Sequence, residues 1–113
     1  MQILHMERKN LNELSQLLKA LGEYNRLSLV YELCGCEKPK GAMCLCECCS
    51  VDASVASRHL KALAHENIVR VEKRGRERLY SLNRTEVPNN LRALADAIDR
   101  GTLHNCNGNV VNE

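Results

Sequence analysis

The chain has 113 residues, a length that suits one domain with one core and excludes two independent cores. Its net charge is +2. It contains three tyrosines, no tryptophan and no phenylalanine, so leucine must supply most of the packing, which favours a small helical protein over a sheet-rich one. The first ten residues lack the apolar run of a signal peptide, and no stretch approaches about 18 apolar residues. The sequence therefore predicts a cytoplasmic protein that does not enter a membrane.

The first predicted helix covers residues 10–21. Leucines recur at the spacing of one helical face, and they are Leu11, Leu14, Leu18 and Leu21. Asn10 and Glu13 have the form of a capping box, although a start near Leu4 is the alternative. Gly22 ends this helix.

A second helix is predicted over residues 24–34. Its expected apolar stripe consists of Leu27, Val30, Tyr31 and Cys34. Because free cysteine is among the most buried residue types, Cys34 is interpreted as a packing residue more readily than as a ligand. Cys36 lies just outside the helix and is freer to coordinate an ion.

Six of the seven cysteines lie between Cys34 and Cys49. Their odd number and a reducing cytoplasm argue against a disulfide framework, so this density indicates thiolate chemistry, either metal binding or redox sensing. The connection over residues 35–43 contains two glycines and a proline and cannot continue a helix. It returns the chain, so that Cys34 and Cys36 can approach the cysteine run of residues 44–49.

Helical geometry divides this cysteine run into two pairs. At about 100° per residue, Cys44 falls close to Cys48, and Cys46 falls close to Cys49 on a different side. Cys44 and Cys46 cannot reach one ion unless the helix is distorted. We expect three thiolates of the run to be ligands, with Cys36 as the outside contributor. Sulfur donors favour soft, thiophilic ions over magnesium, calcium or manganese.

Directly after the cysteine run, a helix with two different faces is predicted. Asp52 can accept a hydrogen bond from an amide of the first turn, so the helix is expected to begin at Ala53. One face is an apolar stripe, which consists of Ala53, Ala56, Leu60 and Leu63. The opposite face carries small hydroxyls and cations, which are Ser54, Ser57, Arg58 and Lys61. Such a face can enter a DNA major groove and meet base edges and phosphates, with a solvated helix face as the alternative.

Residues 68–82 alternate apolar and charged side chains around Gly75, which can take the positive φ of a tight hairpin turn. A two-stranded wing is therefore predicted. Residues 58–78 contain seven basic residues and three acidic ones, so the positive charge is concentrated where a duplex would lie. The expected DNA contacts are Ser54, Ser57, Arg58, His59, Lys61, Lys73, Arg74 and Arg76, with packing as the alternative role of His59.

Pro88 opens the last predicted helix, and Gly101 closes it. One short domain cannot cover two leucine-rich terminal helices, so we expect the first and last helices to pair across a two-fold dimer, with packing inside one protomer as the alternative. The expected interface residues are Leu11, Leu14, Leu18, Leu91, Leu94 and Ile98. Residues 1–103 would then form one DNA-binding and dimerisation domain, followed by a flexible polar tail over residues 104–113, which includes Cys106.

Several short segments carry a resemblance to a known family. They are Leu18-Lys-Ala-Leu-Gly22, Asn25-Arg-Leu27, Cys44-Leu-Cys46-Glu47, Ser57-Arg-His-Leu-Lys-Ala-Leu63, Arg74-Gly75 and Leu79-Tyr80-Ser-Leu82, and they cover roughly residues 14–83. Together they resemble the arsenic-repressor (ArsR/SmtB) family of dimeric winged-helix, metal-sensing repressors. The resemblance implies a mainly α fold with a small β wing, in which a winged helix-turn-helix homodimer is formed through the first and last helices and binds double-stranded operator DNA.

Within that resemblance, Cys44-Leu-Cys46-Glu47 looks like the family's thiolate metal box. It implies a repressor that releases DNA when a soft ion binds, with arsenite or antimonite as the first choice and mercury, cadmium, lead or zinc after them, and with no organic cofactor. The candidate ligands are Cys44, Cys46, Cys48 and Cys49, with Cys36 as a fifth. The interval between the box and Ser57 is a few residues shorter than in the commonest family pattern, so the family's ligand geometry does not transfer directly.

Two other functions compete with this one. A thiol redox or persulfide sensor on the same fold would need only two reactive cysteines and would leave five unexplained. A structural zinc module would hold the loop through a closed tetrathiolate site formed by Cys34, Cys36, Cys44 and Cys46. An enzyme is not expected, because no histidine or carboxylate cluster accompanies the thiols in a catalytic order.

Overall fold

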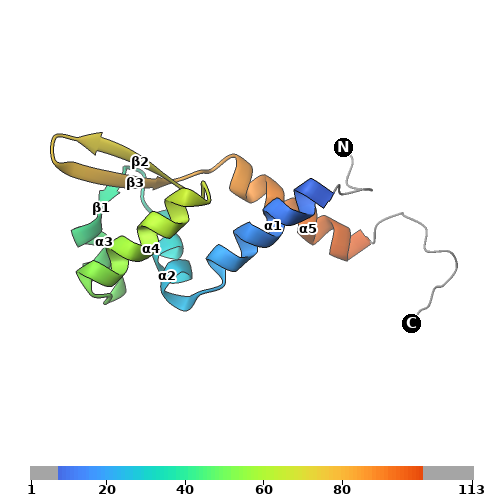
Figure 1. The fold of residues 1–113 in the computed structure, drawn as a ribbon, viewed down its shortest axis with the longest axis horizontal. Coiled ribbons are helices and arrows are strands. Elements are labelled where there is room, and N and C mark those ends of the chain that lie inside the picture. Colours follow the sequence, from blue (N-terminus) through green and yellow to red (C-terminus); the bar gives the residue numbers. More distant parts are fainter. Residues whose placement is uncertain (1–7, 101–113) are drawn as a thin grey trace, which may run out of the picture.

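A computed structural model describes residues 8–100 of the chain. Within these residues, five helices and three short strands follow one another, with the bounds α1 Arg8–Leu21, α2 Tyr24–Cys34, β1 Lys40–Gly41, α3 Ala42–Cys49, α4 Ala53–His65, β2 Val69–Arg74, β3 Glu77–Leu82 and α5 Glu86–Arg100. Figure 1 shows the β2–β3 hairpin at one end of the molecule and helices α1 and α5 at the other, with α2, α3 and α4 grouped beside the sheet. The predicted class, mainly α with a small β wing in a winged helix-turn-helix, is confirmed.

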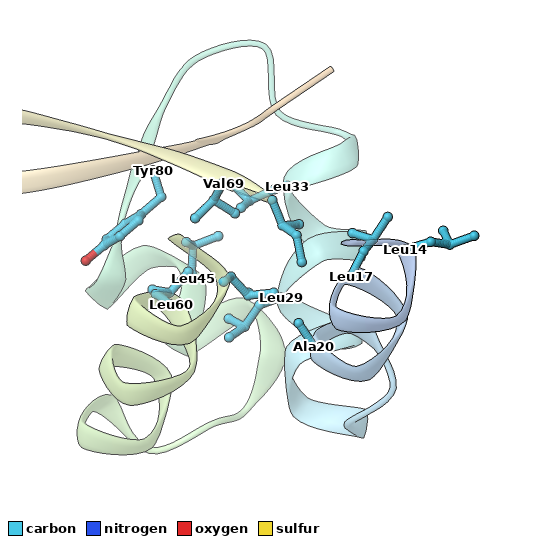
Figure 2. Close-up of a cluster of buried hydrophobic side chains, with 11 residues drawn as sticks. Leu14, Leu17, Ala20, Leu29, Leu33, Leu45, Leu60, Val69 and Tyr80 are labelled. Carbon is cyan, nitrogen blue, oxygen red and sulfur yellow. The ribbon is translucent and has the colours of Figure 1, made fainter. Parts of the chain in front are cut away.

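The core lies where α2, α3 and α4 meet the start of the wing. Its largest fully buried side chains are Leu29, Leu33, Leu45, Leu60, Leu63 and Ile68. Val69 of β2 and Tyr80 of β3 add to this cluster from the sheet, as Figure 2 shows. Burying one leucine side chain contributes about 1.5–3 kcal/mol. These contacts therefore fix the position of α4 relative to α2, α3 and the wing.

β3 is the central strand of an antiparallel sheet with the order β1-β3-β2. At the end of the β2–β3 hairpin, Arg74 pairs with Glu77. Gly75 in the turn has a φ of +63°, a conformation that side-chain-bearing residues rarely adopt, so the predicted glycine turn is confirmed.

Helix α1 already includes Arg8, which places Asn10 and Glu13 inside the helix. The predicted capping box is therefore wrong, and the alternative start near Leu4 lies outside the described residues. The buried side chains of this helix are Leu14, Leu17 and Ala20, whereas Leu11 and Leu18 are exposed.

Helix α2 has the predicted bounds but turns a different face to the core. Leu29 and Leu33 are its buried residues, whereas Leu27, Tyr31 and Cys34 are exposed. Of the predicted stripe only Val30 packs against the core, so the stripe as a whole and the packing role of Cys34 are wrong. The helix carries apolar residues on more than one side, so spacing alone allows two stripes, and the position of α3 and α4 decides which one is buried.

The connection after α2 is shorter than predicted. Lys40–Gly41 forms the short strand β1, and α3 begins at Ala42, so Met43 is helical. Lys40 lies opposite Tyr80 of β3. This pairing holds the start of α3 against the sheet.

Helix α5 begins at Glu86, earlier than the predicted Pro88, because Asn83 supplies the cap. The Asn83 side-chain oxygen accepts hydrogen bonds from the backbone N–H groups of Thr85 (3.2 Å) and Glu86 (3.1 Å). Such a cap satisfies amides that the first turn leaves without a partner. None of the helices in residues 8–100 is both long and apolar enough to cross a membrane.

Candidate DNA interface and thiol cluster

The start of α4 is set by the predicted cap. Asp52 accepts hydrogen bonds from the backbone N–H (3.3 Å) and the hydroxyl (2.8 Å) of Ser54. The buried residues of α4 include Ala56, Leu60 and Leu63, whereas Ala53, which was expected on the same stripe, is exposed. The outward face is formed, as the sequence predicts, by the exposed side chains of Ser54, Ser57, Arg58 and Lys61.

His59 does not lie on this outward face. It is 9% exposed, and its Nε2 atom lies 3.6 Å from a carboxylate oxygen of Glu23, the cap residue of α2. Among the buried side-chain atoms of the described residues, its Nδ1 atom has no hydrogen-bond partner. The expected DNA contact through His59 is therefore corrected to the alternative role, a packing residue between α4 and α2.

The wing follows directly after the end of α4 and is joined to it by a backbone hydrogen bond. The N–H of Ile68 donates to the carbonyl of Leu63 (2.9 Å), which ties the last turn of α4 to the strand that follows. Lys73, Arg74 and Arg76 are exposed at the end of the hairpin. The Arg74 guanidinium is already engaged, because its Nε donates to the Glu72 carboxylate (2.9 Å), a contact that a phosphate would have to compete with or share.

The cysteines of α3 are divided between two sides of a regular helix. Cys44 and Cys48 are exposed, whereas Cys46 is buried and Cys49 is half-buried. The Cys46 thiol donates to the carbonyl of Met43 (3.3 Å), and the Cys49 thiol donates to the carbonyl of Ser28 on α2 (3.6 Å). Cys44 and Cys46 therefore belong to different sides of the helix, as helical geometry predicts.

Cys48 lies beside a carboxylate of the neighbouring helix. The nearby Glu32 carboxylate of α2 is the largest cause that raises the pKa of the Cys48 thiol to about 11, and desolvation and the proximity of Cys44 add to it. Negative charge next to a thiol disfavours the thiolate. Glu32 and Cys44 are thus two neighbouring groups that disfavour the thiolate form of Cys48.

The two cysteines around the end of α2 differ in exposure. Cys34 is exposed, whereas Cys36 is half-buried and its thiol donates to the backbone carbonyl of Glu32 (3.4 Å). The Arg84 guanidinium reaches this segment from the link between β3 and α5 and donates to the carbonyl oxygens of Leu33 (3.1 Å), Cys34 (3.2 Å) and Cys36 (3.2 Å). Within residues 8–100, no three histidine, cysteine or acidic side chains are close enough together to hold a metal ion. Cys106 lies outside the described residues.

The expected interface residues fall into three groups. Leu11, Leu18 and Ile98 are exposed, at 53%, 40% and 74% respectively. Leu91 and Leu94 are half-buried and pack against the protomer's own core. Leu14 is part of that core, so for this residue the alternative of packing inside one protomer is the one observed.

Sequence reasoning missed two residues that contact the segments carrying the cysteines. Glu32 follows no motif, and only the packing of α2 against α3 brings it to Cys48. Arg84 stands in a short link and contacts a segment about fifty residues earlier in the chain. Neither contact has a signal in the sequence, because each joins segments that are not neighbours along the chain.

Known proteins resemble the chain in sequence and in structure. The arsenical resistance operon repressor of Bacillus subtilis is 38% identical over 80 residues, which are 68% of this chain and 72% of that protein. An ArsR-like transcriptional regulator from Rhodococcus has a TM-score of 0.67 at 26% identity, and the match covers 79% of this chain and 82% of that one. HlyU from Vibrio cholerae has a TM-score of 0.66 at 26% identity, with coverage of 80% and 96%.

A third solved structure shows the fold alone. The homodimeric winged helix-turn-helix DNA-binding domain from Mycobacterium bovis has a TM-score of 0.62 at 18% identity and covers 84% of this chain and 89% of that one. No protein-family model matches the chain. The level of identity to the Bacillus subtilis repressor, over more than two thirds of each protein, together with the winged helix-turn-helix, establishes that the chain belongs to the ArsR family of transcriptional regulators.

Proposed function

We propose that this protein is a repressor that binds operator DNA as a homodimer and releases it when a soft, thiophilic ion binds its cysteines, with arsenite or antimonite as the first candidates. The relative from Bacillus subtilis is described as an arsenical resistance operon repressor, which supports a metalloid inducer. The recognition surface would be the exposed face of α4, with Arg58 directed to base edges and the wing cations directed to phosphates.

The observation that carries the proposal is the position of the thiols directly before the recognition helix. Helix α3 ends at Cys49, and α4 begins at Ala53, so only residues 50–52 separate the cysteine run from the DNA-binding face. Ser50 is left-handed, with a φ of 54°, and the N–H of Val51 donates to the carbonyl of Cys46 (3.0 Å). A ligand that draws the thiols of α3 together therefore strains the link that holds α4 in place.

This arrangement allows thermodynamic coupling between the two sites. If ion binding weakens DNA binding by a given factor, DNA must weaken ion binding by the same factor, and couplings of about 1–3 kcal/mol are typical. The donor set fits the proposed ligand class, because α3 exposes two thiols, those of Cys44 and Cys48, and sulfur selects soft ions. The homodimer would use the exposed side chains of α1 and α5, such as Leu11 and Ile98.

The test is a titration of the operator-bound protein with arsenite, antimonite, mercury, cadmium, lead and zinc, with DNA release followed by fluorescence anisotropy. Arsenite or antimonite should lower operator affinity by roughly 5-fold to 150-fold, the range that corresponds to the typical coupling. Unchanged affinity with every ion at saturation would contradict the proposal.

Two further arms separate the alternatives. Release by peroxide or polysulfide, but by none of the ions, would identify a thiol redox or persulfide sensor. A structural zinc module would be isolated with zinc bound, but its four cysteines differ in position, since Cys46 is buried and Cys34 is exposed at the end of α2. The geometry therefore gives the zinc module no support.

A further inference from the structure

We propose that a groove between α1 and α4 binds one phosphate of the DNA backbone in each half-site, with Lys19 and Arg26 as its main contacts. The site depends on the proposed function, because DNA is its ligand. It extends the DNA-binding surface from the outward face of α4 and the wing to the junction of α1 and α2.

The groove opens beside the recognition helix and has a volume of 360 Å³. Three helices line it: the end of α1 through Lys19 and Ala20, the start of α2 through Arg26, and the second half of α4 through Ala62 and His65. Two of its walls therefore carry a permanent positive charge, and the third wall belongs to the helix that is proposed to enter the major groove.

Helical geometry places this groove next to the DNA-facing side of α4. With Arg58 at 0°, a step of about 100° per residue puts His65 near −20°, Ala62 near +40° and Lys61 near −60°. His65 therefore lies on the face that carries Arg58 and Lys61, and Ala62 marks its border on the side of α1 and α2. Because the first residues of a recognition helix contact base edges, the end of α4 with His65 lies closer to the backbone that borders the major groove.

The two cations of the groove suit a phosphate in different ways. Lys19 is exposed, so its ammonium can reach an anion in solvent. Arg26 is half-buried, and its Nε donates to the carbonyl of Ala20 (2.6 Å), which fixes the side chain across the junction of α1 and α2. This bond uses one of the five N–H donors of a guanidinium. The other donors can form charge-assisted hydrogen bonds with phosphate oxygens.

Carboxylates set the limit of the site on its other side. Glu66 lines the groove, and its carboxylate oxygen lies 3.3 Å from Nδ1 of His65. Beyond it, a second cavity of 560 Å³ is lined by the carboxylates of Glu13, Glu66 and Glu86. Like charges repel, so a phosphate is disfavoured in that cavity. The backbone therefore passes over Lys19 and Arg26 and does not continue between α1 and α5.

The test measures the affinity of the reduced full-length protein for a duplex that the protein selects from a random library, about 30 base pairs long to hold two half-sites. Lys19→Ala should weaken binding roughly fivefold or more, and the slope of log affinity against log salt should become shallower by about 0.9 for each phosphate lost. Lys19→Arg keeps the charge and should retain the slope. Arg100→Ala is the matched control, because it removes one positive charge at the end of α5, far from α4 (Figure 1), and should change neither quantity.

Duplexes with one uncharged methylphosphonate locate the contact. At the phosphate that Lys19 binds, the methylphosphonate and Lys19→Ala should together weaken binding no more than either change alone. At every other position the two effects should add. Such coupling separates a DNA contact from a stabilising role of Lys19 at the end of α1, which would weaken binding to all of these duplexes by the same factor.

The proposed contact is overturned if folded Lys19→Ala keeps the affinity and salt slope of the wild type while Arg58→Ala loses affinity. It is also overturned if no methylphosphonate position shows coupling to Lys19. In both cases the wild type still binds DNA, so the proposed function stands. A wild type that selects no duplex would instead contradict the proposed function, and this phosphate site with it.

Discussion

Arg84 and Cys36, which are 48 positions apart in the sequence, are joined by a hydrogen bond of 3.2 Å from the guanidinium to the backbone carbonyl. The same nitrogen also contacts two carbonyls at the end of α2. A cation at a helix C-terminus satisfies carbonyls that have no partner in the helix and interacts favourably with the helix dipole. Arg84 therefore holds the segment that leads into α3 against the link that leads into α5.

Replacing Arg84 by alanine should destabilise the protein by about 1–2 kcal/mol, since hydrogen bonds from a charged donor are worth about 1.5–3 kcal/mol and the exposed position of this side chain reduces that value. Urea unfolding followed by circular dichroism measures the change. Arg84→Lys, which keeps the charge but loses the planar fork, should recover only part of it. An unchanged unfolding midpoint for Arg84→Ala would contradict the stabilising role of these hydrogen bonds.

The Glu32 carboxylate should slow the chemistry of Cys48. The pKa of Cys48 is raised to about 11, so little thiolate is present at pH 8 and its alkylation rate should keep rising with pH until the pH exceeds that value. Glu32→Gln removes the charge, lowers the pKa of Cys48 towards its ordinary value and should accelerate alkylation by iodoacetamide at pH 8 about tenfold or more. Peptide mass spectrometry after timed alkylation gives the rate at this cysteine.

Glu37→Gln is the matched control for this experiment, because Glu37 is an exposed carboxylate in the connection between α2 and β1. It should leave the rate at Cys48 unchanged. Equal rates in the wild type and Glu32→Gln would mean that the carboxylate does not control the thiol.

The recognition helix and the wing were predictable because local signals coincide there. The cap at Asp52, the split between apolar and cationic faces and the glycine at the hairpin turn each depend on residues close in sequence. His59 was the exception, because its place on the side of the helix allowed either a DNA contact or a packing role. The position of α2 decides between them, since His59 lies beside Glu23, the cap residue of α2.

The thiol cluster was predictable only in part. Helix geometry separated Cys44 and Cys48 from Cys46 and Cys49, but it could not say which pair faces the core. That choice follows from Leu45, whose burial between α2 and α4 sets the rotation of α3. Contacts between segments far apart in the chain, such as those of Arg84, leave no periodic pattern in the sequence and could not be predicted.

Arg76 in the turn of the wing should contribute to DNA affinity through phosphate alone. Its side chain is exposed beyond the paired strands, so Arg76→Ala should weaken binding to specific and unspecific duplexes about equally. The slope of log affinity against log salt should become shallower by about 0.9 for each phosphate that the variant no longer neutralises. Anisotropy titrations at several salt concentrations measure both quantities.

Arg58→Ala, on the outward face of α4, provides the comparison. It should reduce binding to the operator more than to unrelated DNA, because a base contact gives about 1–3 kcal/mol of discrimination. Arg100→Ala, at the far end of α5, controls for net charge and should have little effect. A salt-independent affinity of the wild type would exclude the phosphate contacts altogether.

Ile98 should be a principal contact of the proposed homodimer. It is 74% exposed on α5, a large apolar side chain that a second protomer would cover. Ile98→Glu should therefore shift the protein from dimer to monomer in sedimentation equilibrium and should weaken operator binding, since both half-sites would no longer be bound together.

Tyr31→Glu, which alters an equally exposed apolar side chain on α2, should leave the dimer intact. Leu14→Ala should instead lower the free energy of unfolding by about 2–5 kcal/mol, because Leu14 is a core residue of one protomer. If Ile98→Glu remains dimeric while Tyr31→Glu dissociates, the interface lies on α2, and the pairing of the terminal helices is not the dimer of this protein.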